Sequence, residues 1–264
     1  MKICVLVKEV PDAAVEKRMD PNTMKLDRSG EKNLNPFDTH AIEAAMQIKE
    51  GLPEGTVEEV VAVTMGPESA VRALHKAVSL GADRSVQLTD DALAGSDVCA
   101  SGYALAQVLQ SEQPDLVLLG QQSDDGECYT MGAVIADHLQ MPSLTQVIKI
   151  DTSEGKLRCE RQAEYGYDTV EVELPAVISV GDAINEPRYP SLKAIMGAKK
   201  KPLQAVGASD VGIDSSLVGE AGSRVQCGDF HDPAAKAAGQ IIEDEDTNET
   251  VEKIVAWLDE RKLI

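Results

Sequence analysis

The sequence predicts an α/β protein with a doubly wound, mainly parallel sheet, an added antiparallel hairpin and an extended C-terminal arm that ends in a helix. Short apolar runs recur along the first half of the chain, and most are separated by segments with helical periodicity, which is typical of such a sheet. The size agrees, because 264 residues with 43% hydrophobic and 27% charged residues suffice for one large domain plus an appendage.

The parallel part of the sheet is predicted from apolar runs that alternate with amphipathic segments. Buried strands are expected at residues 3–7, 57–64, 86–88 and 116–119. Helices are expected at residues 39–50, 69–80, 97–110 and 131–140. Asp38 or Thr39 is a suitable side-chain cap for the first helix, and Gly51 and Gly81 stand where C-terminal caps belong.

From about Ser143 the pattern changes to that of antiparallel strands. Runs at 145–151 and 157–160 flank the turn residues Ser153, Glu154 and Gly155, and further strands are expected at 169–174 and 176–180. Pro187 and Pro190 then force a turn, after which Ser191 caps a short helix that runs through Ala198.

We divide the chain into an α/β domain over residues 1–202 and a C-terminal arm and helix over residues 203–264. From Pro202 to about Gly239 the chain has few large apolar residues, so this segment cannot build a core of its own. The final helix, 247–262, carries Val251, Ile254, Val255 and Leu258 on one face. It must dock either on its own domain or on another subunit.

Charge and cysteine content limit the partners. The net charge of −20 and the pI near 4.5 argue against nucleic acid or an anionic membrane surface, because both favour clustered Lys and Arg. The five cysteines are widely spaced, which disfavours disulfides and cysteine metal sites and favours a reducing cytoplasm. No window approaches the ~20 apolar residues of a membrane span, and the first apolar run is too short for a signal peptide.

Ligands of doubly wound sheets bind beyond the carboxyl ends of the strands. The loops that follow predicted strands in this way are 8–12, 65–69, 94–97 and 120–132. Gly120, Gly126 and Gly132 do not have the spacing of a Rossmann fingerprint or a Walker loop. A nucleotide can still bind, because amides at the start of the helix at Met131 suit phosphate oxygens; a purely structural loop is the alternative.

The sequence contains no group of residues with the spacing of a known catalytic or metal-binding motif. Asp124, Asp125 and Glu127 are neighbouring carboxylates of the kind found in a solvated turn, and no second ligand cluster accompanies them. The four histidines do not stand beside a candidate nucleophile, and the GxSxG and HExxH motifs are absent. We therefore predict no catalytic residue and no metal site, so hydrolysis has little support.

Several sequence blocks have an order too specific to follow from composition. They are NEPRYPSLKAIMGAKKKP at 185–202, NPFD at 35–38, TMGP at 64–67, LGAD at 80–83, PDLVLLGQQSDDG at 114–126, ERQAEYGYDTVEVE at 160–173, LPAVISV at 174–180 and EDED at 243–246. Together they resemble the beta subunit of electron transfer flavoproteins over essentially the whole chain. The resemblance implies a fold like that of adenine-nucleotide α-hydrolases, an arm that wraps an alpha subunit, and the FAD of that alpha subunit.

The resemblance also implies an adenine-nucleotide site in the loops already selected by strand order. Its residues are Leu6, Lys8, Asn35, Pro36, Phe37, Asp38, Met65, Gly95, Asp97, Gly120, Gln122, Ser123, Asp124, Asp125, Gly126, Glu127, Cys128, Tyr129, Thr130, Met131, Gly132, Ala133 and Val134. The run at 185–202 lies outside these loops, and within it Arg188 is the residue that we would test for a flavin or interface role.

Two branches of this family differ in the ligand of the beta subunit. Ordinary members hold a structural AMP, whereas electron-bifurcating members hold a second FAD that accepts hydride from NADH. VPD at 10–12, GSD at 95–97 and DG at 125–126 resemble the bifurcating branch. Met131 replaces a threonine that contacts the AMP phosphate in ordinary members, a loss of about one hydrogen bond. Val98 and the residues Ser123, Asp124, Glu127, Cys128, Tyr129 and Thr130 depart from the bifurcating pattern.

The resemblance therefore implies a heterodimer subunit that binds FAD and NAD(H). Electrons would pass between NADH, the alpha-subunit FAD, an acyl-CoA-type dehydrogenase and a low-potential acceptor such as ferredoxin or flavodoxin, with the chemistry belonging to the cofactors. One alternative is an ordinary beta subunit with AMP. Another is a stand-alone nucleotide-binding regulatory module, which needs no second subunit.

Overall fold

The computed structural model describes residues 1–153, 156–226, 228, 231, 234–236, 238–239, 241–242 and 246–264. The chain divides into two units, Met1–Gly228 and Asp229–Ile264. Some features of the sequence analysis fall outside the described residues: Glu154 and Gly155 of the expected turn, Cys227, and residues 243–245 of the acidic block.

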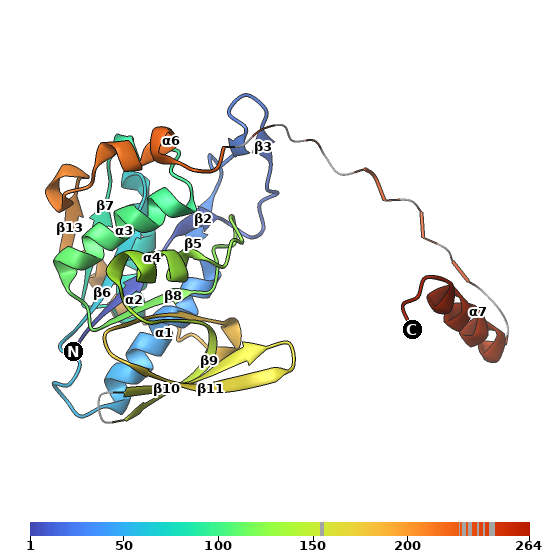
Figure 1. The fold of residues 1–264 in the computed structure, drawn as a ribbon. Coiled ribbons are helices and arrows are strands. Elements are labelled where there is room, and N and C mark those ends of the chain that lie inside the picture. The colour runs from blue at the N-terminus through green and yellow to red at the C-terminus, as the bar shows by residue number, and fades with distance from the viewer. Residues whose placement is uncertain are drawn as a thin grey trace. The chain divides into compact units, whose positions relative to one another are not determined.

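The first unit is built on one large sheet (Figure 1). Its strands are β1 (Lys2–Leu6), β6 (Glu59–Met65), β7 (Arg84–Leu88), β8 (Leu116–Gly120), β9 (Ser143–Ser153), β10 (Lys156–Ala163), β11 (Gly166–Glu173), β12 (Ala176–Val180) and β13 (Leu203–Val206). They lie in the order β11-β10-β9-β12-β8-β1-β6-β7-β13. Only the β9–β10 and β10–β11 pairs are antiparallel, so the mainly parallel sheet and its added hairpin are confirmed.

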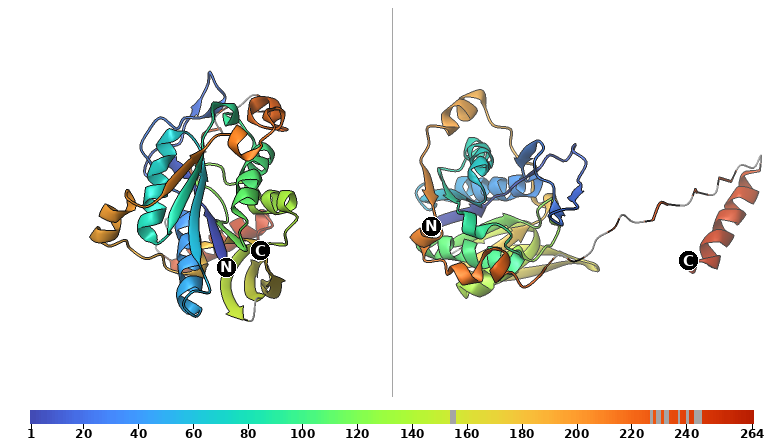
Figure 2. Two further views of the ribbon diagram at one scale, coloured as in Figure 1. Left: turned by 90° about the vertical axis from the view of Figure 1, so that its left-hand side faces the viewer. Right: turned by 90° about the horizontal axis from the view of Figure 1, so that it is seen from above.

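Helices cover both faces of the sheet, which confirms the doubly wound arrangement (Figures 1 and 2). The helices are α1 (Pro36–Gly51), α2 (Val71–Leu80), α3 (Val98–Glu112), α4 (Met131–Leu139), α5 (Leu192–Ala198), α6 (Gly219–Gly222) and α7 (Thr247–Glu260), with short 3₁₀ turns η1 (Glu68–Ala70), η2 (Asp91–Leu93), η3 (Asp182–Ile184), η4 (Ser209–Val211) and η5 (Ser215–Leu217). Ile3 and Val5 of β1 pack in the core with α1 and α2, whereas Cys4 and Leu6 pack in the core with α3 and α4.

The starts of the helices differ in how well the sequence predicted them. Asp97, the first residue of the expected helix at 97–110, is the cap of α3, and its Oδ1 accepts the Ala100 N–H at 2.8 Å. The expected cap of α1 was wrong, because α1 begins at Pro36 and Asp38 lies inside its first turn. Proline suits the first helical position because its missing N–H would have no partner there.

A short excursion between β1 and α1 was not predicted from the sequence. It contains two small antiparallel sheets, one of β2 (Glu9–Pro11) with β5 (Lys32–Leu34) and one of β3 (Met19–Asp20) with β4 (Lys25–Leu26). These strands have only two or three residues each, so no alternation of polar and apolar residues can develop along them.

Residues 203–226 belong to the α/β domain and not to the arm. β13 extends the sheet by pairing parallel with β7, and Val206, Ile213 and Val218 are buried in the core on the α3 face. This segment has few apolar residues, but they fill a core that other elements have already formed. The observed division therefore lies after Gly228, whereas the sequence analysis placed it after Pro202.

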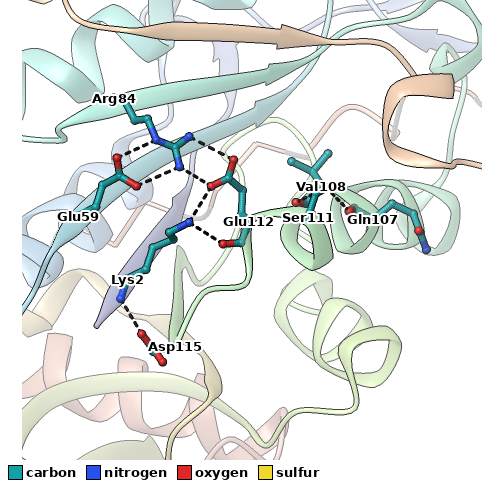
Figure 3. A network of polar contacts seen from close by, with 8 residues as sticks. All are labelled: Lys2, Glu59, Arg84, Gln107, Val108, Ser111, Glu112 and Asp115. Atoms are coloured by element: carbon teal, nitrogen blue, oxygen red, sulfur yellow. Dashed lines mark hydrogen bonds and ion pairs between the residues drawn. The ribbon is translucent and has the colours of Figure 1, made fainter.

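A network of charged residues ties together the amino ends of β1, β6 and β7 (Figure 3). Arg84 Nε donates to Glu59 Oε1 at 2.8 Å, and its Nη2 donates to Glu112 Oε2 at the end of α3. Lys2 Nζ donates to the Glu112 carbonyl at 2.7 Å. This end of the sheet is thus fixed by ion pairs and leaves the opposite, carboxyl end for the functional loops.

The second unit contains α7, which forms as predicted. Asp246 caps it by accepting the Asn248 N–H at 2.8 Å, and the Arg261 guanidinium lies 4.1 Å from the centre of the Trp257 ring. No residue of α7 is buried, and Val251, Ile254 and Val255 expose 45–51% of their surface. In the part of the chain that the structure describes, no helix has the length and apolar character needed to cross a membrane.

Candidate functional site

A cavity of about 340 Å³ lies at the carboxyl ends of β1, β6 and β8. The chain continues from β1 to β6 on one side, whereas β8 pairs with β1 on the other, so the strand order reverses here. Open α/β sheets bind ligands at this reversal. The starts of α1, α3 and α4 contribute the remaining walls.

The structure brings many of the predicted site residues together. Those that line the cavity are Leu6, Lys8, Asn35, Asp38, Met65, Asp97, Gly120, Gln122, Ser123, Gly126, Cys128, Tyr129 and Met131. Those outside its lining are Pro36, Phe37, Gly95, Asp124, Asp125, Glu127, Thr130, Gly132, Ala133 and Val134. Most of the second group support the walls: Thr130 precedes α4, Gly132 packs on Leu119, and Val134 packs on Gly102 of α3.

Further lining residues were not among the predicted site residues, although Ser96 and Gln121 lie in the predicted loops 94–97 and 120–132. These further residues are Val7, Val63, Ser96, Val98, Ser101, Leu105, Leu119 and Gln121. Val98, Ser101 and Leu105 are spaced by three and four residues, so they share the face of α3 that points to the cavity. Because Asp97 was already predicted to belong to the site, the helical spacing of the residues that follow it could have indicated which of them face the cavity.

Asn35 joins the start of α1 to the loop after β8. Its side chain is almost completely buried, and Nδ2 donates to Asp38 Oδ1 at 2.9 Å and to the Gln122 carbonyl at 2.8 Å. Its Oδ1 accepts the Asp124 N–H at 3.1 Å. All the polar groups of the Asn35 amide are used within the protein, so this residue shapes the cavity.

Gly120 permits the close approach of β8 to α1. A Cβ atom at this position would lie 2.6 Å from the Phe37 carbonyl carbon and 2.7 Å from Asp38 Oδ1. Real Cβ contacts are longer than this, so a side chain here would push the start of α1 away from the cavity. Glycine is required by packing, although the φ of this residue is not positive.

Asp125 is buried between two cations. Its carboxylate has no exposed surface and pairs with Lys8 Nζ at 2.7 Å and with Arg28 Nη2 at 2.8 Å. Although burial raises the pKa of Asp125, these two cations hold it below its ordinary value. The interpretation of the acidic residues 124–127 as a solvated turn was therefore wrong for Asp125, because its partners come from distant parts of the chain.

Gln122 presents a polar atom for which the described part of the chain offers no partner. Its Oε1 is buried without a hydrogen bond, beside the start of α4. Thr130 precedes α4 without a side-chain cap, so the first N–H groups of this helix are available to an anionic group. With Leu6, Val63 and Leu119 as apolar walls, the cavity suits a ligand that has one flat apolar part and one anionic part.

Sequence similarity to known proteins identifies the family of the chain. The family model "Electron transfer flavoprotein domain" matches residues 23–211. The chain is 40% identical over 267 residues to the electron transfer flavoprotein subunit beta of Mycobacterium tuberculosis, covering 99% of each chain. The chain belongs to the electron transfer flavoprotein beta-subunit family.

Two further relatives of this beta subunit match along the whole chain. The electron transfer flavoprotein subunit beta of Thermoanaerobacterium thermosaccharolyticum and the Caffeyl-CoA reductase-Etf complex subunit CarD of Acetobacterium woodii are each 36% identical over 266 residues, covering 100% of both chains. The family resemblance inferred from the sequence blocks is thereby confirmed.

Arg188 of this beta subunit does not line the cavity. Its guanidinium binds two glutamates of α1: Nε donates to Glu43 Oε2 at 2.6 Å and Nη1 to Glu50 Oε1 at 2.7 Å. Because Glu43 is buried and Arg188 half-buried, this contact fastens the segment before α5 to the outer side of α1. The arrangement supports a structural role for Arg188 within the domain.

Proposed function

We propose that this beta subunit binds an adenine nucleotide in the cavity and works as part of a heterodimer with an electron transfer flavoprotein alpha subunit. The observation that carries the proposal is the cavity itself, which is lined by apolar walls, by the start of α4 and by Gln122, whose buried Oε1 has no partner among the described residues. Gln122 Oε1 can accept an N–H or O–H of the ligand, and the amides of α4 can donate to a phosphate.

We propose FAD as the nucleotide, with NADH as the electron donor. Met131 supports this choice, because it lines the cavity at the position where the family resemblance implies a phosphate-binding threonine in AMP-holding members, and a thioether cannot donate that hydrogen bond. When bound, FAD supplies hydride acceptance and one-electron transfer; the residues of this chain bind it, orient it and exclude water.

AMP is the second candidate, and one observation favours it. A cavity of about 340 Å³ lies near the lower end of the roughly 300–1,000 Å³ usual for small-molecule sites. That volume suits a mononucleotide within this chain alone. For FAD, part of the cofactor would have to lie outside this cavity.

The unit Asp229–Ile264 is proposed to bind the alpha subunit through α7. The exposed side chains of Val251, Ile254, Val255 and Trp257 give this helix an apolar surface that needs a partner.

An acyl-CoA-type dehydrogenase is proposed to bind elsewhere, at α5 and the residues just before it, where Tyr189, Leu192 and Met196 expose 75–97% of their surface. The Acetobacterium relative is named as a subunit of a caffeyl-CoA reductase-Etf complex, which supports a partner of this class. Ferredoxin or flavodoxin is proposed as the low-potential acceptor.

Cofactor counting tests this function. The chain is purified with its alpha subunit, and the FAD and AMP released by denaturation are measured per heterodimer. Two FAD per heterodimer are expected, and one FAD with one AMP would identify an ordinary member of the family. A chain that is monodisperse and colourless alone, with α7 protected from proteolysis, would instead favour the stand-alone regulatory module.

A further inference from the structure

Residues 12–31, which include β3 and β4, are held by ion pairs to the loop on one side of the cavity. We call this segment the strap. Lys17 Nζ lies 2.8 Å from Asp124 Oδ2, and Arg28 Nε donates to Asp125 Oδ2 at 2.9 Å. Both carboxylates stand between Ser123 and Gly126, which line the cavity.

The strap is also held on the opposite side of the cavity. Lys25 Nζ pairs with Glu220 of α6, next to Gly95. Gly95 precedes Ser96 and Asp97, which line the cavity at the start of α3. In Figure 1 and in the left view of Figure 2, the β3–β4 region and α6 lie at the same end of the domain. The strap thus connects two opposite walls, although none of its residues lines the cavity.

The segment that receives Lys25 is itself fastened to the cavity wall. Asp97 Oδ2 accepts the N–H groups of Arg224 at 2.7 Å and Val225 at 2.9 Å, and Gly219 N donates to Ser96 Oγ at 2.7 Å. Lys25 therefore forms its ion pair with a segment that is hydrogen-bonded to the start of α3. Lys17 and Arg28 form theirs with the loop that leads to α4.

The charges of the strap matter for an anionic ligand. Asp124 and Asp125 place two carboxylates beside a cavity proposed to hold phosphate, and uncompensated carboxylates would repel it. Lys17 and Arg28 supply the compensation, together with Lys8. Lys17, Lys25 and Arg28 nonetheless expose 35–48% of their side chains, so salt can weaken their ion pairs from the solvent side.

We propose that the strap is an ionic latch that holds two walls of the cavity together and thereby controls exchange of the bound nucleotide. The inference rests on the proposed nucleotide site. A latched strap retains the nucleotide and cancels the charges of Asp124 and Asp125. An open strap lets the two walls separate and leaves Asp124 and Asp125 without the cations Lys17 and Arg28, so release is fast.

Nucleotide release from the purified heterodimer tests the latch. The heterodimer is loaded with FAD or with radiolabelled AMP, and release into excess unlabelled nucleotide is timed for the wild type, for K17Q/R28Q and for K25Q. R18Q is the matched control, because Arg18 lies in the strap but its ion pair is with Glu16 of the same strap. Release is expected to be about tenfold faster in K17Q/R28Q and several-fold faster in K25Q, and unchanged in R18Q.

Two independent readouts complete the experiment. Raising the NaCl concentration should speed release from the wild type but change it little in K17Q/R28Q, and proteinase K should cut residues 12–31 faster in that variant. Equal release rates in K17Q/R28Q, K25Q and R18Q, with normal nucleotide content, would overturn the latch and leave the nucleotide site intact. Failure of wild type and R18Q alike to retain either nucleotide would overturn both the site and the latch.

Discussion

The Lys8 backbone N–H donates to Asp38 Oδ2 at 2.8 Å, which joins the end of β1 to the first turn of α1 at the cavity. Asp38 is almost completely buried, and burial raises its pKa to about 7, while hydrogen bonds from Asn35, Lys8 and Gly120 act in the opposite direction. A carboxyl group with this environment takes up a proton far more readily in the folded chain than in the unfolded one.

Asp38 should therefore make folding stability depend on pH. The folded pKa of about 7 exceeds the ordinary value of 3.8, so the folded state binds more protons between these values. The stabilisation from Asp38 is complete below pH 3.8 and is lost as the pH rises through about 7. Denaturant unfolding of the wild type and D38N at several pH values checks this: only the wild type should lose this component between pH 4 and 7. Parallel pH profiles would contradict the assignment.

Replacement of Asn35 by alanine should destabilise the domain by about 2 kcal/mol, because it removes the Asn35 partner of Asp38 Oδ1, of the Asp124 N–H and of the Gln122 carbonyl. Urea unfolding of N35A measures the loss. The matched control is N33A, since Asn33 is an exposed neighbour two residues away. An equal effect of the two changes would show that the Asn35 network carries no special stability.

The parallel sheet and the loops that follow its strands could be predicted because both depend on the local order of apolar and polar residues. Alternation of apolar runs with amphipathic segments gives the strands and helices, and strand order then selects the loops after β1, β6 and β8. Asn35 and Asp38 entered the site through the family resemblance. Their place at the cavity depends on α1 beginning at Pro36, which the cap analysis had put later.

The remaining features depend on contacts between distant residues. Nothing near Asp125 in the sequence indicates that Lys8 and Arg28 surround it. In the same way, β13 is a strand because the edge of β7 is available to it, and Leu203–Val206 alone is too short to give a clear pattern. Such pairings are set by tertiary structure, so local periodicity does not reveal them.

The cysteines should react with a thiol reagent at different rates. Cys128 is exposed and lines the cavity, whereas burial raises the pKa of Cys4 to about 12 and that of Cys159 to about 11. We expect iodoacetamide at pH 8 to alkylate Cys128 well before Cys4 and Cys159, as mapped by mass spectrometry. Saturating nucleotide should slow alkylation of Cys128. Unaltered alkylation of Cys128 in the loaded heterodimer would count against a ligand beside this residue.

Replacement of Arg188 should affect stability and spare nucleotide content. R188K keeps the charge but loses the planar fork that binds Glu43 and Glu50 together, so a loss of about 1–2 kcal/mol in unfolding free energy is expected. K193Q, at an exposed lysine of the same run, is the control. If R188K keeps its stability but loses flavin or the alpha subunit, Arg188 has the flavin or interface role that the sequence suggested, and the structural role is wrong.

The amount of adenine nucleotide extracted per heterodimer from a cavity-filling variant tests most directly whether the cavity is the nucleotide site. Val98 is half-buried at the start of α3 and lines the cavity, so V98F places a ring inside it. V170F is the matched control, because Val170 is a half-buried valine of β11 that does not line the cavity. We expect the wild type and V170F to retain the beta-subunit nucleotide and V98F to lose most of it while still pairing with the alpha subunit. Full nucleotide content in V98F would contradict the cavity as the nucleotide site.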